Sequence, residues 1–226
     1  MNARLVMVLA GLLAAPAGSA AAQRPAGWIA APNLAEVAAA YPQRARLARR
    51  AGAAELTCGV NFDGWLRDCA VLAEQPAGEG FGIAARRLAE RFRTVRTSSL
   101  ANGADVRLRI AFRPEMLQPG SFVVQTPAWA ALPSAADFQA TFPKIANDVN
   151  EVRVVMTCSV AAGGALSACA VEREDPAGQG YGAGALALAP KIRVGLWTPD
   201  GLPTVGARVR VPIRYELRPA PAAATP

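Results

Sequence analysis

The chain of 226 residues contains an internal repeat, and this repeat constrains the fold more than any other feature. Trp28 and Tyr41-Pro42 recur 101 positions later (28 to 129) as Trp129 and Phe142-Pro143. From Cys58 onward the shift is 100 positions (58 to 158), because the second copy is one residue shorter before this point. The second matched segment pairs Cys58, Cys69, Glu74, Pro76, Gly78, Gly80, Gly82 and Arg93 with Cys158, Cys169, Glu174, Pro176, Gly178, Gly180, Gly182 and Arg193.

The repeat predicts two copies of one small domain. The first covers residues 28–113, the second covers 129–217, and residues 114–128 form a linker. In both copies a capping residue, Asn33 or Ser134, precedes an acidic residue by three positions, which is typical of a helix start. A proline after the aromatic residue at 41 or 142 then interrupts the helix, because proline disfavours helical geometry in the residue before it. A second helical piece is expected to reach about Ala51 or Asp148.

The rest of each copy predicts a β-hairpin, a helix and a last strand. The helix shows apolar residues at helical spacing over 81–92 and 181–192. The last strand alternates polar and apolar residues over 106–112, and its counterpart at 209–215 contains Pro212, which is tolerated mainly at a sheet edge. The fold class is therefore α+β, with two tandem domains that each place helices on a short antiparallel sheet.

The hairpin register follows from the cysteines. If Cys58 lies opposite Cys69, Asp63-Gly64 forms a two-residue turn at the centre, and the same pairing in the second copy centres on Gly163-Gly164. Opposed Cα atoms in an antiparallel pair lie about 4.5 to 5.5 Å apart, within the reach of a disulfide. Four cysteines allow three connectivities, and the duplication favours Cys58–Cys69 and Cys158–Cys169. The side chains expected on the buried face of the first hairpin are Leu56, Cys58, Val60, Cys69 and Val71.

The composition argues against catalysis. The chain contains no histidine, which removes Ser-His and Cys-His pairs and most zinc sites. Glu74 and Glu174-Asp175 could carry carboxylate chemistry, but they lie at hairpin ends, where turn residues and ion-pair partners are common. The glycines that follow lack the lysine and hydroxyl residue of a phosphate-binding loop. We expect no catalytic residue, metal or cofactor.

The N-terminus predicts export. Residues 1–22 combine Arg4, a short apolar run from Leu5 to Ala15 and small residues, as in a secretory signal peptide. The alternative is an uncleaved inner-membrane anchor, although a spanning helix needs about 20 apolar residues. We expect a periplasmic protein, where disulfides persist, with a disordered tail over 218–226.

The net charge of +7 raises the question of a nucleic-acid partner, but export argues against it. Residues 24–113 contain 14 arginines and 8 acidic residues, whereas residues 129–218 contain 9 basic and 8 acidic residues. A basic first copy is compatible with peripheral contact with anionic lipid headgroups or with an acidic protein.

With its elements in the order helix, hairpin, helix and strand, each copy resembles the C-terminal domain of TonB. The similarity rests on Tyr41-Pro42-x-x-Ala45, on its counterpart Phe142-Pro143-x-x-Ala146, on the hairpins and the helices, and most on the segment from Trp197 to Tyr215. The resemblance implies a periplasmic module that binds an extended segment of an outer-membrane receptor by adding it to a sheet edge. It departs from the family in lacking a long proline-rich spacer, and the first copy has no Trp-x-Pro segment.

Carried over by this resemblance, the expected protein-binding edge strands are the last strand of each copy. Their residues are Val106, Leu108, Ile110 and Phe112, and Val209, Val211, Ile213 and Tyr215. The alternative is a structural or assembly factor whose open edges pair with one another into a homo-oligomer.

Overall fold

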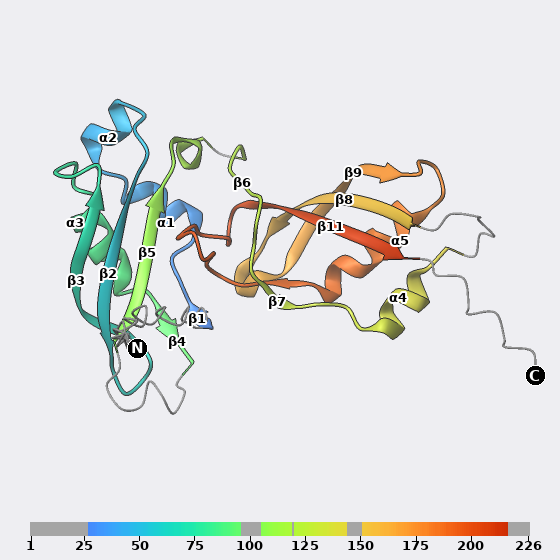
Figure 1. Ribbon diagram of the computed structural model, residues 1–226, viewed down its shortest axis with the longest axis horizontal. Helices are drawn as coiled ribbons and strands as arrows, with labels where there is room; N and C mark the ends of the chain where they lie inside the picture. Colours follow the sequence, from blue (N-terminus) through green and yellow to red (C-terminus); the bar gives the residue numbers. More distant parts are fainter. Residues whose placement is uncertain (1–26, 96–104, 119, 144–150, 217–226) are drawn as a thin grey trace, which may run out of the picture.

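The computed structural model describes residues 27–95, 105–118, 120–143 and 151–216. The predicted signal peptide, the C-terminal tail and the second helical piece predicted up to Asp148 lie outside these ranges. The described chain is a mixed α+β structure in which two sheet-and-helix halves lie next to each other along the long axis (Figure 1). Among the described residues, no helix has the length and apolar character needed to cross a membrane.

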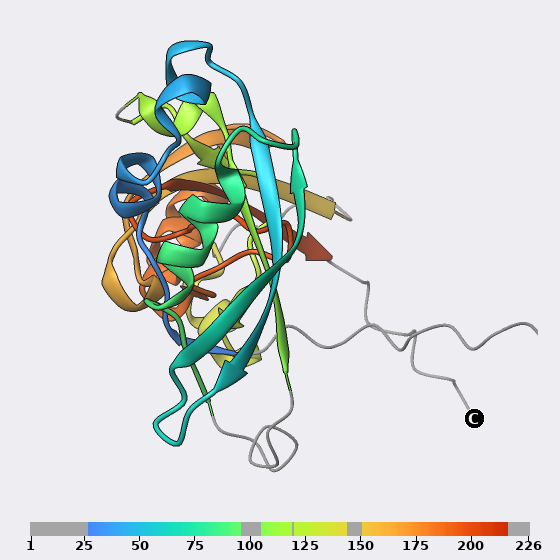
Figure 2. The ribbon, with the colours of Figure 1, turned by 90° about the vertical axis from the view of Figure 1, so that its left-hand side faces the viewer.

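The first half contains a three-stranded antiparallel sheet with the strand order β3-β2-β5. Helix α3 packs against one face of this sheet, and α1 and α2 lie beside it (Figure 2). A separate two-stranded pair, β1 with β4, was not predicted. The elements are β1 (Trp28–Ala30), α1 (Leu34–Ala39), α2 (Gln43–Leu47), β2 (Gly52–Val60), β3 (Leu66–Gln75), α3 (Phe81–Ala89), β4 (Arg93–Thr94) and β5 (Val106–Phe112).

The second half repeats this arrangement with a four-stranded sheet in the order β6-β11-β8-β9. Its short strand pair joins β10 and β7. The elements are β7 (Trp129–Ala131), α4 (Ala135–Thr141), β8 (Glu151–Val160), η2 (Ala162–Gly164), β9 (Leu166–Asp175), α5 (Tyr181–Leu188), η3 (Ala189–Lys191), β10 (Arg193–Val194) and β11 (Arg208–Glu216).

The segment predicted as a linker is partly structured. It contains η1 (Pro114–Leu117) and β6 (Val123–Val124), and β6 pairs in parallel with the first two residues of β11. Residues 123–124 of this segment thus form an outer strand of the second sheet. Alternating apolar residues explain this, because Phe122 and Val124 are both buried.

Helix starts follow the sequence signals closely. The side chain of Asn33 accepts a hydrogen bond from the Glu36 amide, and the Glu36 carboxylate accepts one from the Asn33 amide. Ser134 and Asp137 form the same capping box at the start of α4. Each box satisfies backbone donors that the first turn of a helix leaves unpaired, which fixes where α1 and α4 begin.

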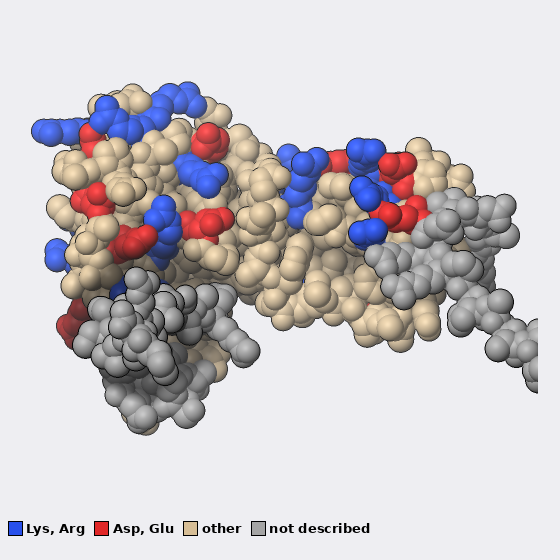
Figure 3. All heavy atoms as spheres, in the orientation of Figure 1, with Lys and Arg blue, Asp and Glu red and all other residues tan. Residues whose placement is uncertain are grey.

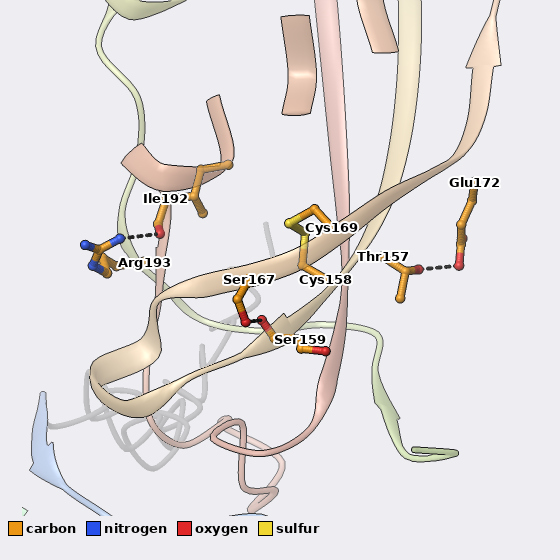
Figure 4. The surroundings of a disulfide bond; sticks show 8 residues. All are labelled: Thr157, Cys158, Ser159, Ser167, Cys169, Glu172, Ile192 and Arg193. Atoms are coloured by element: carbon orange, nitrogen blue, oxygen red, sulfur yellow. Dashed lines mark hydrogen bonds between the residues drawn. A yellow bond between two sulfur atoms is a disulfide. The ribbon is translucent and has the colours of Figure 1, made fainter. Parts of the chain in front are cut away.

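Both predicted disulfides are present, Cys58–Cys69 and Cys158–Cys169. Figure 4 shows the second bridge linking β8 and β9. Such bridges are typical of proteins from an oxidising compartment outside the cytoplasm. The predicted register holds only in the middle of each hairpin, where Thr57 pairs with Ala70 in the first copy and Thr157 with Ala170 in the second.

The hairpin turns differ from the prediction because each hairpin contains β-bulges. Two residues of β3 oppose Cys58, and one of them, Asp68, has a positive φ of 51°. The extra residue shifts the register by one, so the turn spans Asn61 to Trp65 and is not the two-residue turn expected at Asp63-Gly64. The second hairpin has the same bulge at Ala168 and a turn from Ala161 to Ala165.

The repeated glutamate at the hairpin end is a helix cap. The Glu74 carboxylate accepts hydrogen bonds from the amides of Gly80 (2.7 Å) and Phe81 (3.0 Å) at the start of α3. Glu174 does the same for Gln179 (3.1 Å) and Tyr181 (2.9 Å) at α5. A carboxylate also interacts favourably with the positive end of the helix dipole. These contacts give both glutamates a structural role.

An aromatic trio fills the same place in each core. Tyr41 packs edge-on against Phe81 and Phe112 in the first half, and its hydroxyl donates to the Arg50 carbonyl at 2.6 Å. The counterpart trio is Phe142, Tyr181 and Tyr215. Within the described ranges, the buried hydroxyls of Tyr181 and Tyr215 have no hydrogen-bond partner. Burial raises the pKa of Tyr215, and the nearby Tyr181 adds a smaller contribution in the same direction. The Tyr215 phenol is therefore held in the neutral form.

Candidate functional site

The predicted docking edges are the outer edges of β5 and β11, and the side chains named for them lie in the core. All eight are at most 7% exposed. Their side chains form one buried face in each half, and a buried side chain cannot form a pocket for a guest. The residues concerned are Val106, Leu108, Ile110, Phe112, Val209, Val211, Ile213 and Tyr215.

Two hydrogen bonds on the outer side of β5 show which of its residues direct their backbone groups outward. The Ala111 amide donates to the Gly201 carbonyl at 2.8 Å, and the Arg109 carbonyl accepts from the Trp197 indole at 3.1 Å. Backbone groups alternate along a strand, so Arg107, Arg109 and Ala111 direct theirs outward. The even-numbered residues of β5 bond to β2 instead. The residues named for this strand, Val106, Leu108, Ile110 and Phe112, therefore direct their backbone groups toward β2, and their part in binding a guest stays a prediction.

The same reasoning applies to β11. The Arg208 amide donates to the Phe122 carbonyl on the outer side at 3.1 Å, so Arg210, Pro212 and Arg214 also direct their backbone groups outward. Pro212 has no amide proton to donate, and its outward position explains why the strand tolerates it. The named residues Val209, Val211, Ile213 and Tyr215 direct their backbone groups toward β8.

Much of the β5 edge is covered by a loop from the second half, residues 197–206. Trp197 is buried, packs edge-on against Phe92 of the first half at 4.8 Å, and donates to Arg109. Gly201 approaches β5 so closely that an added Cβ would lie 2.6 Å from the Arg109 carbonyl oxygen. The Val205 carbonyl accepts the Leu34 amide of α1 at 2.9 Å. The loop therefore occupies the part of the edge from Arg109 to Ala111.

The β11 edge is covered only at its start. β6 pairs with Arg208 and Val209, and this ladder ends at Val124. From Pro212 to Glu216, no strand of the described chain pairs with the outer side of β11, whereas β8 pairs with its inner side throughout. We call this stretch, where no described strand adds to the sheet, the β11 open edge.

The exposed face beside the β11 open edge carries ion pairs. Arg210 contacts Glu172 across the sheet at 2.9 Å, and Arg214 contacts Glu151 at 3.0 Å. A hydrogen bond from Thr157, with a second from Arg210, lowers the pKa of Glu172. Figure 3 shows this mixture of basic and acidic side chains over the second half. The face is thus charged in both signs along the edge and does not form an apolar pocket.

The sequence reasoning missed the role of Trp197. The signal was present, because the Trp-x-Pro segment occurs in the second copy alone. A feature present in one copy of a duplicated domain is not needed to fold that domain. It is therefore a candidate for contact between the copies, which is the role that the structure gives it.

Comparison with known proteins identifies a related protein whose function is not described. No family model matches the chain. An uncharacterized protein of Caulobacter vibrioides is 33% identical over 92 residues, which cover 39% of this chain and 92% of that protein. The chain belongs to the same family as this protein. The matched length is close to that of one half, residues 129–216.

Proposed function

We propose that this protein is a binding module of the periplasm that accepts an extended segment of another protein at the β11 open edge. The observation that carries the proposal is that no strand of the described chain pairs with the outer side of β11 from Pro212 to Glu216. The buried side chains hold the strand in place, and an extended segment can add to a sheet edge that no other strand covers. The resemblance to the C-terminal domain of TonB supports a receptor segment as the guest, with a role in transport across the outer membrane.

The chain already pairs its own extended segments with both docking strands. Val123–Val124 adds to β11, and the Gly201 carbonyl binds to β5. These contacts support the view that the edges accept added backbone. Because the loop covers β5 from Arg109 to Ala111, β11 is the better site for a guest.

The outward amide of Glu216 provides a direct test, because the alternation that begins at Arg208 also directs this amide away from β8. Glu216→Pro removes this donor without removing a bond to β8, and we expect it to weaken binding of an extended peptide at least fivefold, since one hydrogen bond contributes about 1 kcal/mol. Pro212→Val adds a donor on the same edge and should strengthen binding. Fluorescence anisotropy with labelled peptides from the N-termini of outer-membrane receptors measures both effects.

The matched control is Arg107→Pro, which makes the same change on the outer edge of β5 and should leave binding intact. Circular dichroism must show that each variant keeps its fold. Equal affinity of the Glu216→Pro variant and the unchanged protein would rule out the β11 open edge. An absence of saturable binding to any of the peptides would count against the receptor-binding function itself.

A second candidate function is self-association, and the outer strand β3 favours it. The side chains of Val71 and Leu72 are 40% and 51% exposed, contrary to the burial expected for Val71. No strand of the described chain pairs with the outer side of β3. The corresponding strand β9 has Glu172 in place of Leu72, and charged residues on an edge strand prevent edge-to-edge pairing.

Placing the glutamate of β9 at the matching position of β3 tests whether the protein self-associates through β3. If two chains pair through β3, Leu72→Glu should abolish a concentration-dependent increase in mass measured by sedimentation velocity. Leu132→Glu, at a 66% exposed leucine of the second half, is the control and should leave the increase unchanged. A mass that stays monomeric over the whole concentration range in the unchanged protein would remove this candidate.

A further inference from the structure

The end of the first half that carries α2 is a basic surface with an apolar side chain at its centre. We call it the α2 tip: Arg44, Arg46, Leu47, Arg49 and Arg50. Figure 1 shows α2 projecting from one end of the first half, and Figure 3 shows basic atoms gathered over the same place. Leu47 is 79% exposed, the largest exposure among the hydrophobic side chains of the first half except for Phe62.

The charge of the α2 tip is only partly balanced. Arg50 pairs with Glu79, and Arg46 donates to the Ala38 carbonyl. Within the described ranges, no carboxylate forms an ion pair with Arg44 or Arg49. Glu79 is therefore the one acidic partner that the tip has in this part of the chain, and two guanidinium groups beside Leu47 are available to an anionic ligand.

The internal repeat shows that the fold does not require this composition. Residues 43–50 contain four arginines and no acid, whereas the corresponding residues 144–151 contain one lysine and two acids, Asp148 and Glu151. Asp148 takes the place of Leu47. The alanine at position 45, which is fully buried, is kept as Ala146. The second copy thus keeps the alanine that packs in the core of the first half, and its sequence differs at the positions that are exposed there.

The combination of unpaired arginines with an exposed leucine points to a membrane surface. Each arginine near an anionic bilayer contributes about 1 kcal/mol, which is about a fivefold increase in partitioning. An exposed leucine adds to this by entering the boundary between headgroups and acyl chains. A soluble polyanion would bind the arginines but would gain nothing from Leu47. We propose that the α2 tip binds the surface of bilayers that contain anionic phospholipid.

Vesicle flotation tests the proposal with the whole mature chain. Binding is measured on vesicles of phosphatidylcholine alone and of phosphatidylcholine mixed with phosphatidylglycerol, and we expect it on the mixed vesicles only. Arg44→Gln with Arg49→Gln should weaken this binding about 25-fold, from two arginines at about fivefold each. Leu47→Ser should weaken it about tenfold. Raising the salt concentration should weaken the arginine-dependent part.

The control is Arg173→Gln with Arg208→Gln, which makes the same change of charge at exposed positions of the second half and should change binding less than twofold. Three outcomes would overturn the proposal. These are equal binding to neutral and mixed vesicles, equal losses in the two double variants, or full binding by the Leu47→Ser variant. The last result would show that the tip is a site for soluble polyanions. None of these outcomes bears on peptide binding at β11.

Discussion

Replacing Trp197 with alanine should destabilise the protein by about 4 kcal/mol and separate the unfolding of the two halves. The side chain is buried, packs edge-on against Phe92 at 4.8 Å, and donates to the Arg109 carbonyl at 3.1 Å. Truncating a buried tryptophan costs about 3 to 5 kcal/mol, because a cavity is left and packing is lost. These contacts join the halves, so their loss should replace one cooperative transition with two. Urea denaturation followed by circular dichroism measures both effects.

Trp129→Ala is the control for this experiment. Trp129 is 38% exposed and lies at the position that Trp28 occupies in the first half. Its replacement should cost about 1 kcal/mol or less, as is usual for residues outside the core. If both tryptophan variants lose the same stability, or if the Trp197→Ala variant keeps a single transition, the loop 197–206 does not couple the two halves.

Replacing Gly164 with alanine should destabilise the second half by about 4 kcal/mol, whereas the same change at Gly163 should cost about 1 kcal/mol. Both glycines lie in the turn between β8 and β9 with positive φ angles of 68° (Gly163) and 77° (Gly164). A left-handed backbone costs a non-glycine residue about 1 to 2 kcal/mol. At Gly163 an added Cβ would meet no atom within 4 Å, but at Gly164 it would lie 1.9 Å from the Val194 carbonyl oxygen. The difference should therefore come from the collision with backbone.

Thermal unfolding of the two alanine variants, monitored by circular dichroism, measures this difference. The Gly163→Ala variant is the matched control, since it has the same chemistry and the same class of backbone angle one residue away. Equal melting temperatures for the two variants would mean that β10 moves away from the turn at little cost, contrary to the close packing expected of a folded interior.

The repeat and the local signals predict most of the architecture. Capping residues, proline positions and apolar periodicity act over a few residues, and the structure follows them in α1, α3 and the last strands. The disulfides could be predicted because duplication selects one of three pairings. The bulges at Asp68 and Ala168 could not, since neither position carries a glycine to mark its positive φ.

The docking residues show a different limit. Alternation in β11 identifies Val211 and Ile213 as buried side chains, but burial concerns the faces of a sheet and docking concerns its edge. Pro212 carried the missing information, because a residue without an amide proton belongs on the outer side. This would have assigned the outward groups to Arg210 and Arg214. The contact of Trp197 with the first half is long-range, so its signal was the presence of Trp-x-Pro in one copy alone and not a pattern of neighbouring residues.

Two crossing segments tie the halves together. Val123–Val124, which leaves the first half, completes the sheet of the second, and the loop 197–206 of the second half returns to cover the first. Cutting the chain between them, near residue 128, would yield two fragments that each lack a piece supplied by the other. Such fragments should recombine when mixed, because each presents the surface that the other fits.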